Sequence, residues 1–138
     1  MRKKVGGVFS DDIAIDLGTA NTLVHVAGRG IIIDEPSVVA VRAKDNPRHV
    51  IAVGEAALTL KTRSPDPIEL VRPLRDGVIA DFVATEEMLR SFITRAKSKY
   101  GFRRPRSLIC VPAAATPVER RAVYETARAA GARRVYLV

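Results

Sequence analysis

The chain has 138 residues, of which 47% are hydrophobic and 28% charged, and this is the composition of an ordinary globular domain without a membrane-spanning run of roughly 20 apolar residues. Its formal net charge of +8 suggests an anionic partner, but aromatic residues make up only 5%, tryptophan is absent, and no nucleic-acid-binding motif occurs. We therefore expect no nucleic-acid partner. Cys110 is the single cysteine, which excludes an internal disulfide, and the lack of a signal-peptide pattern predicts a cytoplasmic protein.

Residues 1–10 form a basic and weakly amphipathic tail. Three consecutive basic residues follow the first methionine, and apolar residues recur at helical spacing. Such a segment could lie on an anionic lipid surface. The alternative is a frayed tail, because Gly6 and Gly7 each cost about 1 kcal/mol in a helix. The apolar positions are Met1, Val5, Val8 and Phe9.

The stretch from Asp11 to Val26 predicts a β-hairpin with a tight polar tip. Ile13 and Ile15 alternate with small or charged residues, and a β-rich composition resumes at Leu23. Gly18 allows a backbone conformation closed to other residues and lets a ligand approach closely, and the turn N–H groups can donate hydrogen bonds. We therefore expect the tip to bind a phosphate. Its candidate side-chain donors are Thr19, Asn21 and Thr22.

Asp16 ends the first strand directly before this turn. Its carboxylate would repel a phosphate unless a cation lay between them, so we predict that Asp16 holds a hydrated Mg²⁺ through water. The alternative is an ordinary hairpin whose polar turn binds nothing.

The pattern Asp-x-Gly-Thr-x-x-Thr after an apolar strand resembles the first phosphate loop of the superfamily that contains actin, the heat-shock chaperone ATPases and the sugar kinases. The sequence contains neither a Gly-x-x-x-x-Gly-Lys-Ser/Thr P-loop nor a Gly-x-Gly-x-x-Gly dinucleotide fingerprint after a strand. The resemblance thus indicates a nucleotide-binding protein of the actin superfamily, and not a P-loop or a dinucleotide-binding protein.

The middle of the chain predicts short strands and one short helix. After a turn at residues 28–30 and an apolar run at 31–33, a strand at 38–41 and its return at 50–53 flank a polar loop. A helix is expected over 55–61. The segment from Thr62 to Val71 contains Pro65 and Pro67, and we expect it to be an irregular, exposed connection.

The second half alternates strands and helices. Residues 72–81 are expected to return to buried structure. A helix with an apolar stripe is predicted to begin at Thr85–Glu87 and to end at Gly101, and a capping box at Thr116–Glu119 begins another. Strands are expected at 106–112 and 133–138, joined by a helical crossover in an α/β sheet that the first hairpin extends antiparallel.

Five strings spread over the chain are together similar to the MreB family of bacterial actin homologues, which determine rod shape. The resemblance implies an actin-like (ribonuclease H-like) ATPase fold of which this chain is the first lobe only. It is a mixed sheet flanked by helices, formed by residues 11–33 and 72–138, with a small inserted β-rich subdomain at 34–71. The strings are Ile15–Thr22, Asp34–Ala40, Arg72–Phe82, Cys110–Pro112 and Val118–Ala122.

The resemblance also implies a function. Members bind ATP with Mg²⁺, polymerise into filaments on the inner face of the cytoplasmic membrane, and guide the cell-wall elongation machinery. Carried over to this sequence, Thr19, Ala20 and Asn21 contact the nucleotide phosphates, Gly18 gives backbone access, and Asp16 lies behind the metal.

The chain differs from the family pattern in length, because the water-orienting acidic residue, the second phosphate loop and the second lobe are not in it. The family is a slow ATPase, and we expect this chain to hydrolyse ATP very slowly or not at all, since a half-cleft cannot position water and stabilise charge on both sides of the phosphate. Glu119 and Glu125 are expected to be cap and surface residues. Two alternatives stay open: a sugar kinase or chaperone ATPase of the same superfamily, and a non-catalytic basic module that binds anionic membrane or regulates a full-length filament.

Overall fold

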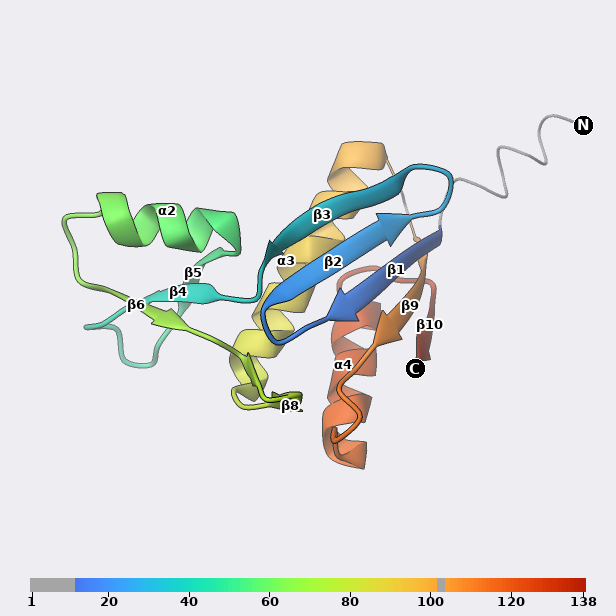
Figure 1. The fold of residues 1–138 in the computed structure, drawn as a ribbon. Helices are drawn as coiled ribbons and strands as arrows, with labels where there is room; N and C mark the ends of the chain where they lie inside the picture. The colour runs from blue at the N-terminus through green and yellow to red at the C-terminus, as the bar shows by residue number, and fades with distance from the viewer. Residues whose placement is uncertain (1–11, 102–103) are drawn as a thin grey trace, which may run out of the picture.

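The computed structural model describes residues 12–101 and 104–138. The predicted basic tail at residues 1–10 lies outside the described residues. The principal sheet has five strands in the order β10-β9-β1-β2-β3 (Figure 1). These strands are β1 (Asp12–Leu17), β2 (Asn21–Val26), β3 (Gly30–Pro36), β9 (Arg106–Cys110) and β10 (Arg134–Leu137).

The predicted hairpin is confirmed, with β1 antiparallel to β2 from the pair Ile13 and Val26 to the pair Leu17 and Thr22. The expectation that the hairpin joins the rest of the sheet antiparallel is wrong, because β1 pairs with β9 in parallel. The long connection from β1 to β9 includes α3 (Phe82–Tyr100), and a crossover of that kind returns the chain in the same direction. The second crossover is as expected, since α4 (Pro117–Ala129) joins the parallel strands β9 and β10.

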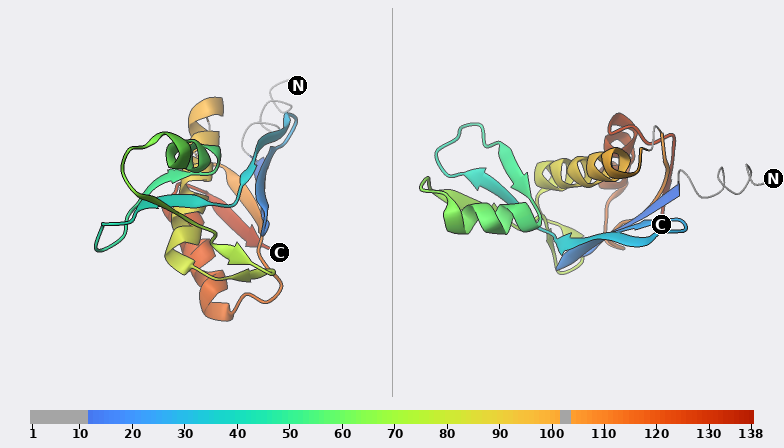
Figure 2. Two further views of the ribbon diagram at one scale, coloured as in Figure 1. Left: turned by 60° about the vertical axis from the view of Figure 1, so that its left-hand side comes forward. Right: turned by 90° about the horizontal axis from the view of Figure 1, so that it is seen from above.

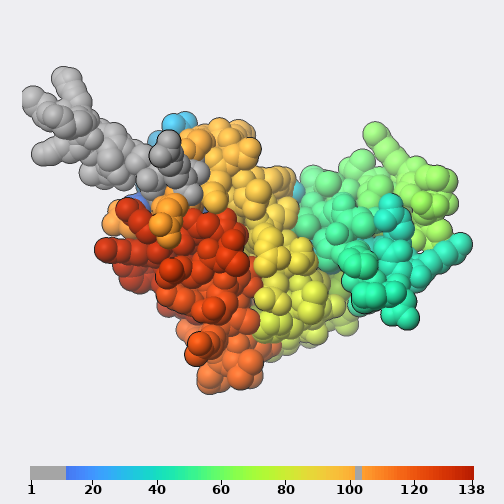
Figure 3. All heavy atoms as spheres, turned by 180° about the vertical axis from the view of Figure 1, so that it is seen from behind, coloured from blue at the N-terminus to red at the C-terminus, as the bar shows by residue number. Residues whose placement is uncertain are grey.

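Both long helices lie on one face of the principal sheet (Figure 2). Strand alternation turns Ile13, Ile15 and Leu17 of β1 toward α3, whose buried stripe includes Met88 and Phe92. Figure 3 shows α3 and α4 side by side over that face. The apolar face of the hairpin strand is therefore fixed in the core, and the turn after it is held at the end of a buried strand.

The start of α3 differs from the prediction. The helix begins at Phe82, three positions before Thr85, and Asp81 is its N-cap, because the Asp81 carboxylate accepts a hydrogen bond of 3.0 Å from the N–H of Ala84. The end is as predicted, at Gly101 in the left-handed conformation with φ 69°.

The capping box of α4 is confirmed. The Thr116 hydroxyl accepts from the N–H of Glu119 at 3.1 Å, and the Glu119 carboxylate accepts from the N–H of Thr116 at 2.8 Å. Glu119 is thus a cap, as expected. Proline at the first helical position adds a residue whose backbone is already shaped for a helix.

A second sheet, in the order β5-β4-β6, lies beside α3 (Figure 3). The prediction of an irregular connection from Thr62 to Val71 is wrong at both ends. The helix before it continues to Arg63, and Ile68 and Val71 are buried in a strand that pairs with β4. Pro65 and Pro67 precede this strand, so neither removes a donor from its ladder. The elements are β4 (Val39–Arg42), β5 (Val50–Val53), α2 (Glu55–Arg63) and β6 (Ile68–Val71).

A short hairpin of β7 (Leu74–Arg75) and β8 (Val78–Ile79) leads from the second sheet to α3. Leu74 is buried, as expected for this part of the chain, but the tip at Asp76 and Gly77 is exposed and has positive φ angles. Among the described residues, no helix is both long and apolar enough to cross a membrane.

Candidate functional site

The candidate site is the turn between β1 and β2. Leu17 is buried at its beginning and Thr22 is buried at its end, whereas Thr19, Ala20 and Asn21 are exposed. In Figure 1 this turn lies at the end of the hairpin nearest to β8. The two anchoring residues hold an exposed polar turn against the core, which is the arrangement that the sequence predicted.

Gly18 is required in this turn for space and not for an unusual backbone conformation. Its φ lies outside the left-handed region that glycine alone adopts easily, which corrects the prediction. A Cβ at this position would collide with the carbonyl oxygen of Asn21, which lies directly against Gly18. The absence of a side chain therefore allows the turn to close tightly.

Ser37, just after β3, lies behind the turn and is completely buried. Its hydroxyl donates a hydrogen bond of 2.6 Å to the carbonyl of Gly18, and its N–H donates one of 2.8 Å to the carbonyl of Ala20. The hydroxyls of Ser37 and Thr22 are 2.8 Å apart. Because the single hydroxyl proton of Ser37 goes to Gly18, Thr22 must be the donor in this pair.

This hydrogen-bond chain changes the role of Thr22. Its hydroxyl was expected to donate to a bound phosphate, but its side chain is fully buried and its proton is committed to Ser37. In this structure Thr22 supports the turn from within the sheet.

The exposed residues of the turn have neighbours from distant segments. The hydroxyl of Thr19 accepts a hydrogen bond of 3.1 Å from the N–H of Gly77 at the tip of the β7–β8 hairpin. The side-chain amide of Asn21 donates to the Asp34 carboxylate at 2.8 Å. Since an amide nitrogen carries two protons and a hydroxyl keeps its own proton while accepting, both side chains retain a donor for a ligand.

Asp16 is exposed, and its position on β1 alternates with the buried Ile15 and Leu17. No group of three or more His, Cys, Asp or Glu side chains that could hold a metal occurs among residues 12–101 and 104–138. A lone carboxylate beside a candidate phosphate-binding turn nevertheless fits Mg²⁺, because this ion commonly keeps most of its waters and takes one or two carboxylates together with phosphate oxygens. The donor set therefore suits Mg²⁺ bound with a phosphate.

Next to the turn, the Glu35 carboxylate joins three elements. It accepts a hydrogen bond of 2.8 Å from Arg95 on α3 and one of 3.1 Å from the N–H of Glu55 at the start of α2. Burial alone would raise the pKa of Glu35, but these two hydrogen bonds and the charge of Arg95 outweigh it and lower the pKa below its ordinary value of 4.5. Glu35 also supplies the cap that Gly54, the N-cap residue of α2, lacks.

The turn is identifiable from the sequence, but the residues that support it are not. Gly18, Thr19, Ala20 and Asn21 lie together, as adjacent residues of a turn must, with Asp16 close by in the chain. Asp34, Ser37 and Gly77 come from other segments, and only the strings that resemble a known family drew attention to them.

The chain is similar to known proteins over its whole length. Residues 10–138 match the family model described as MreB/Mbl protein. The chain is 52% identical to the cell shape-determining protein MreB of Escherichia coli K12, aligned over 100% of this chain and 41% of the relative, and 51% identical to the cell shape-determining protein Mbl of Bacillus subtilis 168, over 94% and 38%. It therefore spans about two-fifths of the length of these curated relatives.

Solved structures give the same result. The crystal structure of MreB5 of Spiroplasma citri bound to ADP matches with a TM-score of 0.72 and 36% identity, covering 91% of this chain and 37% of that one. Its counterpart bound to AMPPNP matches with a TM-score of 0.69 and 37% identity, covering 91% and 37%. The described residues thus form the first lobe of an actin-like ATPase fold.

With the sheet order, the turn and these similarities together, the class is that of the bacterial actin homologues. The chain belongs to the MreB/Mbl family.

Proposed function

We propose that the turn between β1 and β2 binds the phosphates of ATP, and that this chain is the nucleotide-binding first lobe of an actin-like cytoskeletal protein. The observation that carries the proposal is the exposed tip at Thr19 and Asn21 on a turn anchored by two buried residues. Solved relatives with the same fold are bound to ADP and AMPPNP, which supports a nucleotide as the ligand.

Each residue of the proposed site has a separate task. Thr19 and Asn21 donate to phosphate oxygens, Gly18 lets the backbone come close, and Ala20 leaves the tip free of bulk. Asp16 holds Mg²⁺ through water, and that ion supplies positive charge beside the phosphates.

At the level of the cell, the proposed role is to form filaments on the inner face of the cytoplasmic membrane and to guide the cell-wall elongation machinery. The support is the family itself, because relatives at 52% and 51% identity are cell shape-determining proteins. The location in the cytoplasm and at its membrane is part of this proposal.

Hydrolysis by this lobe alone is expected to be very slow or absent. In-line attack on the terminal phosphate needs a positioned water and charge stabilisation around the transferred group. The turn offers donors from one side only, so a second surface must complete the site.

The proposal is tested by NMR titration of the ¹⁵N-labelled chain with MgATP. We expect weak binding, in the range of about 1 mM or above, that shifts the amide resonances of residues 18–21. Resonances of α4, which contributes no residue to the turn, serve as the internal control. Shifts confined to other regions, or none at 10 mM or so, would refute binding at this turn.

A further inference from the structure

Ser37 makes three hydrogen bonds to the turn between β1 and β2, although it lies outside that hairpin. It is fully buried and lies directly after β3, and it reaches back to hold two carbonyls of the turn, those of Gly18 and Ala20. A third hydrogen bond joins its hydroxyl to Thr22. One residue outside the β1–β2 hairpin thus fixes the turn at its beginning, middle and end.

These contacts determine the direction of two N–H groups. In a trans peptide, the N–H points opposite to the C=O of the same peptide unit. The Gly18 carbonyl points to Ser37, so the N–H of Thr19 points away from it. The Ala20 carbonyl also points to Ser37, so the N–H of Asn21 points away as well.

We infer that Ser37 is a positioning residue, which orders the turn so that the N–H groups of Thr19 and Asn21 are presented to an anion before it binds. Fixing these peptide planes in advance removes an ordering cost from binding. The role in phosphate affinity rests on the proposed function, whereas the ordering of the turn does not.

The experiment compares Ser37→Ala with Thr126→Val, each in the full 138-residue chain. Both variants remove a buried hydroxyl that makes a hydrogen bond; Thr126 is on α4, 2% exposed, and donates to Glu86 at 2.8 Å. The first readout is the ¹⁵N order parameter of the Thr19 and Asn21 amides without ligand. The second is the dissociation constant for MgATP from the same NMR titration.

In Ser37→Ala we expect the order parameters of Thr19 and Asn21 to fall from about 0.85 to below about 0.6, while Thr126→Val leaves them unchanged. We expect the MgATP dissociation constant to rise about tenfold in Ser37→Ala only, the size of effect that one hydrogen bond can have.

The outcomes separate the two proposals. Order parameters in Ser37→Ala equal to those of Thr126→Val would overturn the role of Ser37. A loosened turn in Ser37→Ala together with a wild-type chain that ignores MgATP would support the positioning role and refute the proposed function. A loosened turn with unchanged MgATP affinity would overturn the role of Ser37 in binding.

Discussion

Glu35 on β3 and Arg95 on α3 form an ion pair in which the carboxylate oxygen and the guanidinium nitrogen are 2.8 Å apart. The same carboxylate accepts from the N–H of Glu55 and so caps α2 of the second sheet. Glu35 follows Asp34, which contacts Asn21 of the turn between β1 and β2. The principal sheet, the second sheet and the turn are therefore connected within a few residues of chain.

Replacing Glu35 by Gln should lower the free energy of unfolding by about 1 kcal/mol, because a charged hydrogen bond and a helix cap are weakened while Arg95 stays partly solvated. Urea unfolding at pH 7 measures the change. Glu69→Gln is the matched control: its pair with Arg48 is about half exposed on both sides, so we expect a cost within about 0.5 kcal/mol. Equal losses in the two variants would contradict the special role of Glu35.

The lowered pKa of Glu35 predicts a pH dependence with a definite sign. The folded state favours the carboxylate, so its contribution to stability is fully present above the ordinary value of about 4.5 and is lost as the pH falls through the lowered pKa. We expect the stability of the wild type and of Glu35→Gln to converge in acid. A difference between them that grows below pH 4.5 would have the wrong sign.

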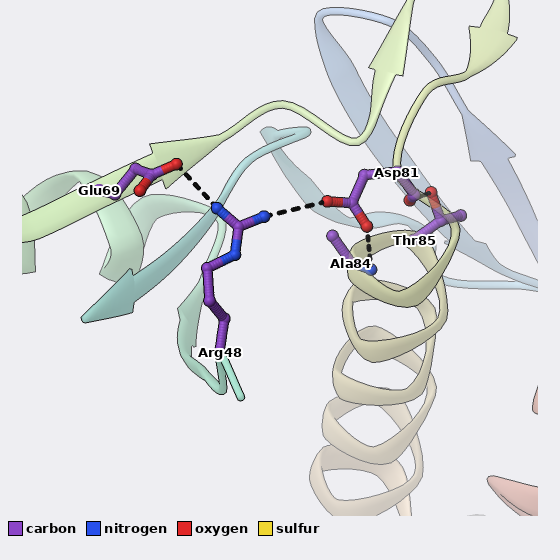
Figure 4. A network of polar contacts seen from close by, with 5 residues as sticks. All are labelled: Arg48, Glu69, Asp81, Ala84 and Thr85. Atoms are coloured by element: carbon purple, nitrogen blue, oxygen red, sulfur yellow. Dashed lines mark hydrogen bonds and ion pairs between the residues drawn. The ribbon is translucent and has the colours of Figure 1, made fainter. Parts of the chain in front are cut away.

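Asp81 separates the effect of a helix cap from that of an ion pair. Figure 4 shows its carboxylate between the N–H of Ala84, at 3.0 Å, and the guanidinium of Arg48, at 3.7 Å. Asp81→Ala should cost about 1 kcal/mol, whereas Asp81→Asn should cost less than half of that, because asparagine caps a helix as well as aspartate does. Thermal unfolding of both variants measures this. If asparagine destabilises as much as alanine, the pair with Arg48 is the dominant contact.

The two faces of β9 should respond differently to truncation. Ile109 is fully buried beneath the helices, and Leu108 is 41% exposed on the other face of the sheet. Ile109→Ala should lower the free energy of unfolding by about 2 to 5 kcal/mol, and Leu108→Ala by less than about 1 kcal/mol. Urea unfolding of the two variants, analysed with the same m-value, measures both changes in the free energy of unfolding. A loss in Leu108→Ala as large as that in Ile109→Ala would contradict the prediction, because it would mean that Leu108 is buried in solution.

Adding a methyl group at Gly18 should disturb the turn, because the new Cβ would collide with the carbonyl of Asn21. We expect Gly18→Ala to cost about 1 to 3 kcal/mol, the usual range for overpacking. Ala20→Ser, a change at an exposed position of the same turn, is the control and should be nearly neutral. A free energy of unfolding in Gly18→Ala equal to that of the wild type would contradict this prediction, because it would show that the turn accommodates the Cβ.

Local patterns predicted much of the fold. The capping box at Thr116 and the left-handed Gly101 were identifiable because caps are encoded by a few adjacent residues. The start of α3 was placed too late because Asp81 follows an apolar run that belongs to the β7–β8 hairpin, and its capping role becomes evident only with that hairpin in place. The strand at Ile68 was missed because prolines before it suggested a loop, although they end just outside the ladder.

The sequence predicted the position of the turn, but it did not predict the buried hydrogen bonds that hold the turn in place. Thr19 and Asn21 are two positions apart in the same turn, so the local sequence was sufficient to predict a phosphate site there. Ser37 reaches them only through the register of β2 against β3, which contains an irregularity between Val24 and His25. Because register depends on the whole sheet, the roles of Ser37 and Thr22 could not be read from spacing.

The central claim is that this lobe is half of a nucleotide site, and calorimetric titration with MgATP tests it most directly. The 138-residue chain is compared with a form extended by the second lobe of a family member. We predict micromolar binding by the extended form and little or no heat from the shorter chain, because the phosphates need donors from both sides. Micromolar binding by the 138-residue chain itself, or none by the extended form, would contradict it.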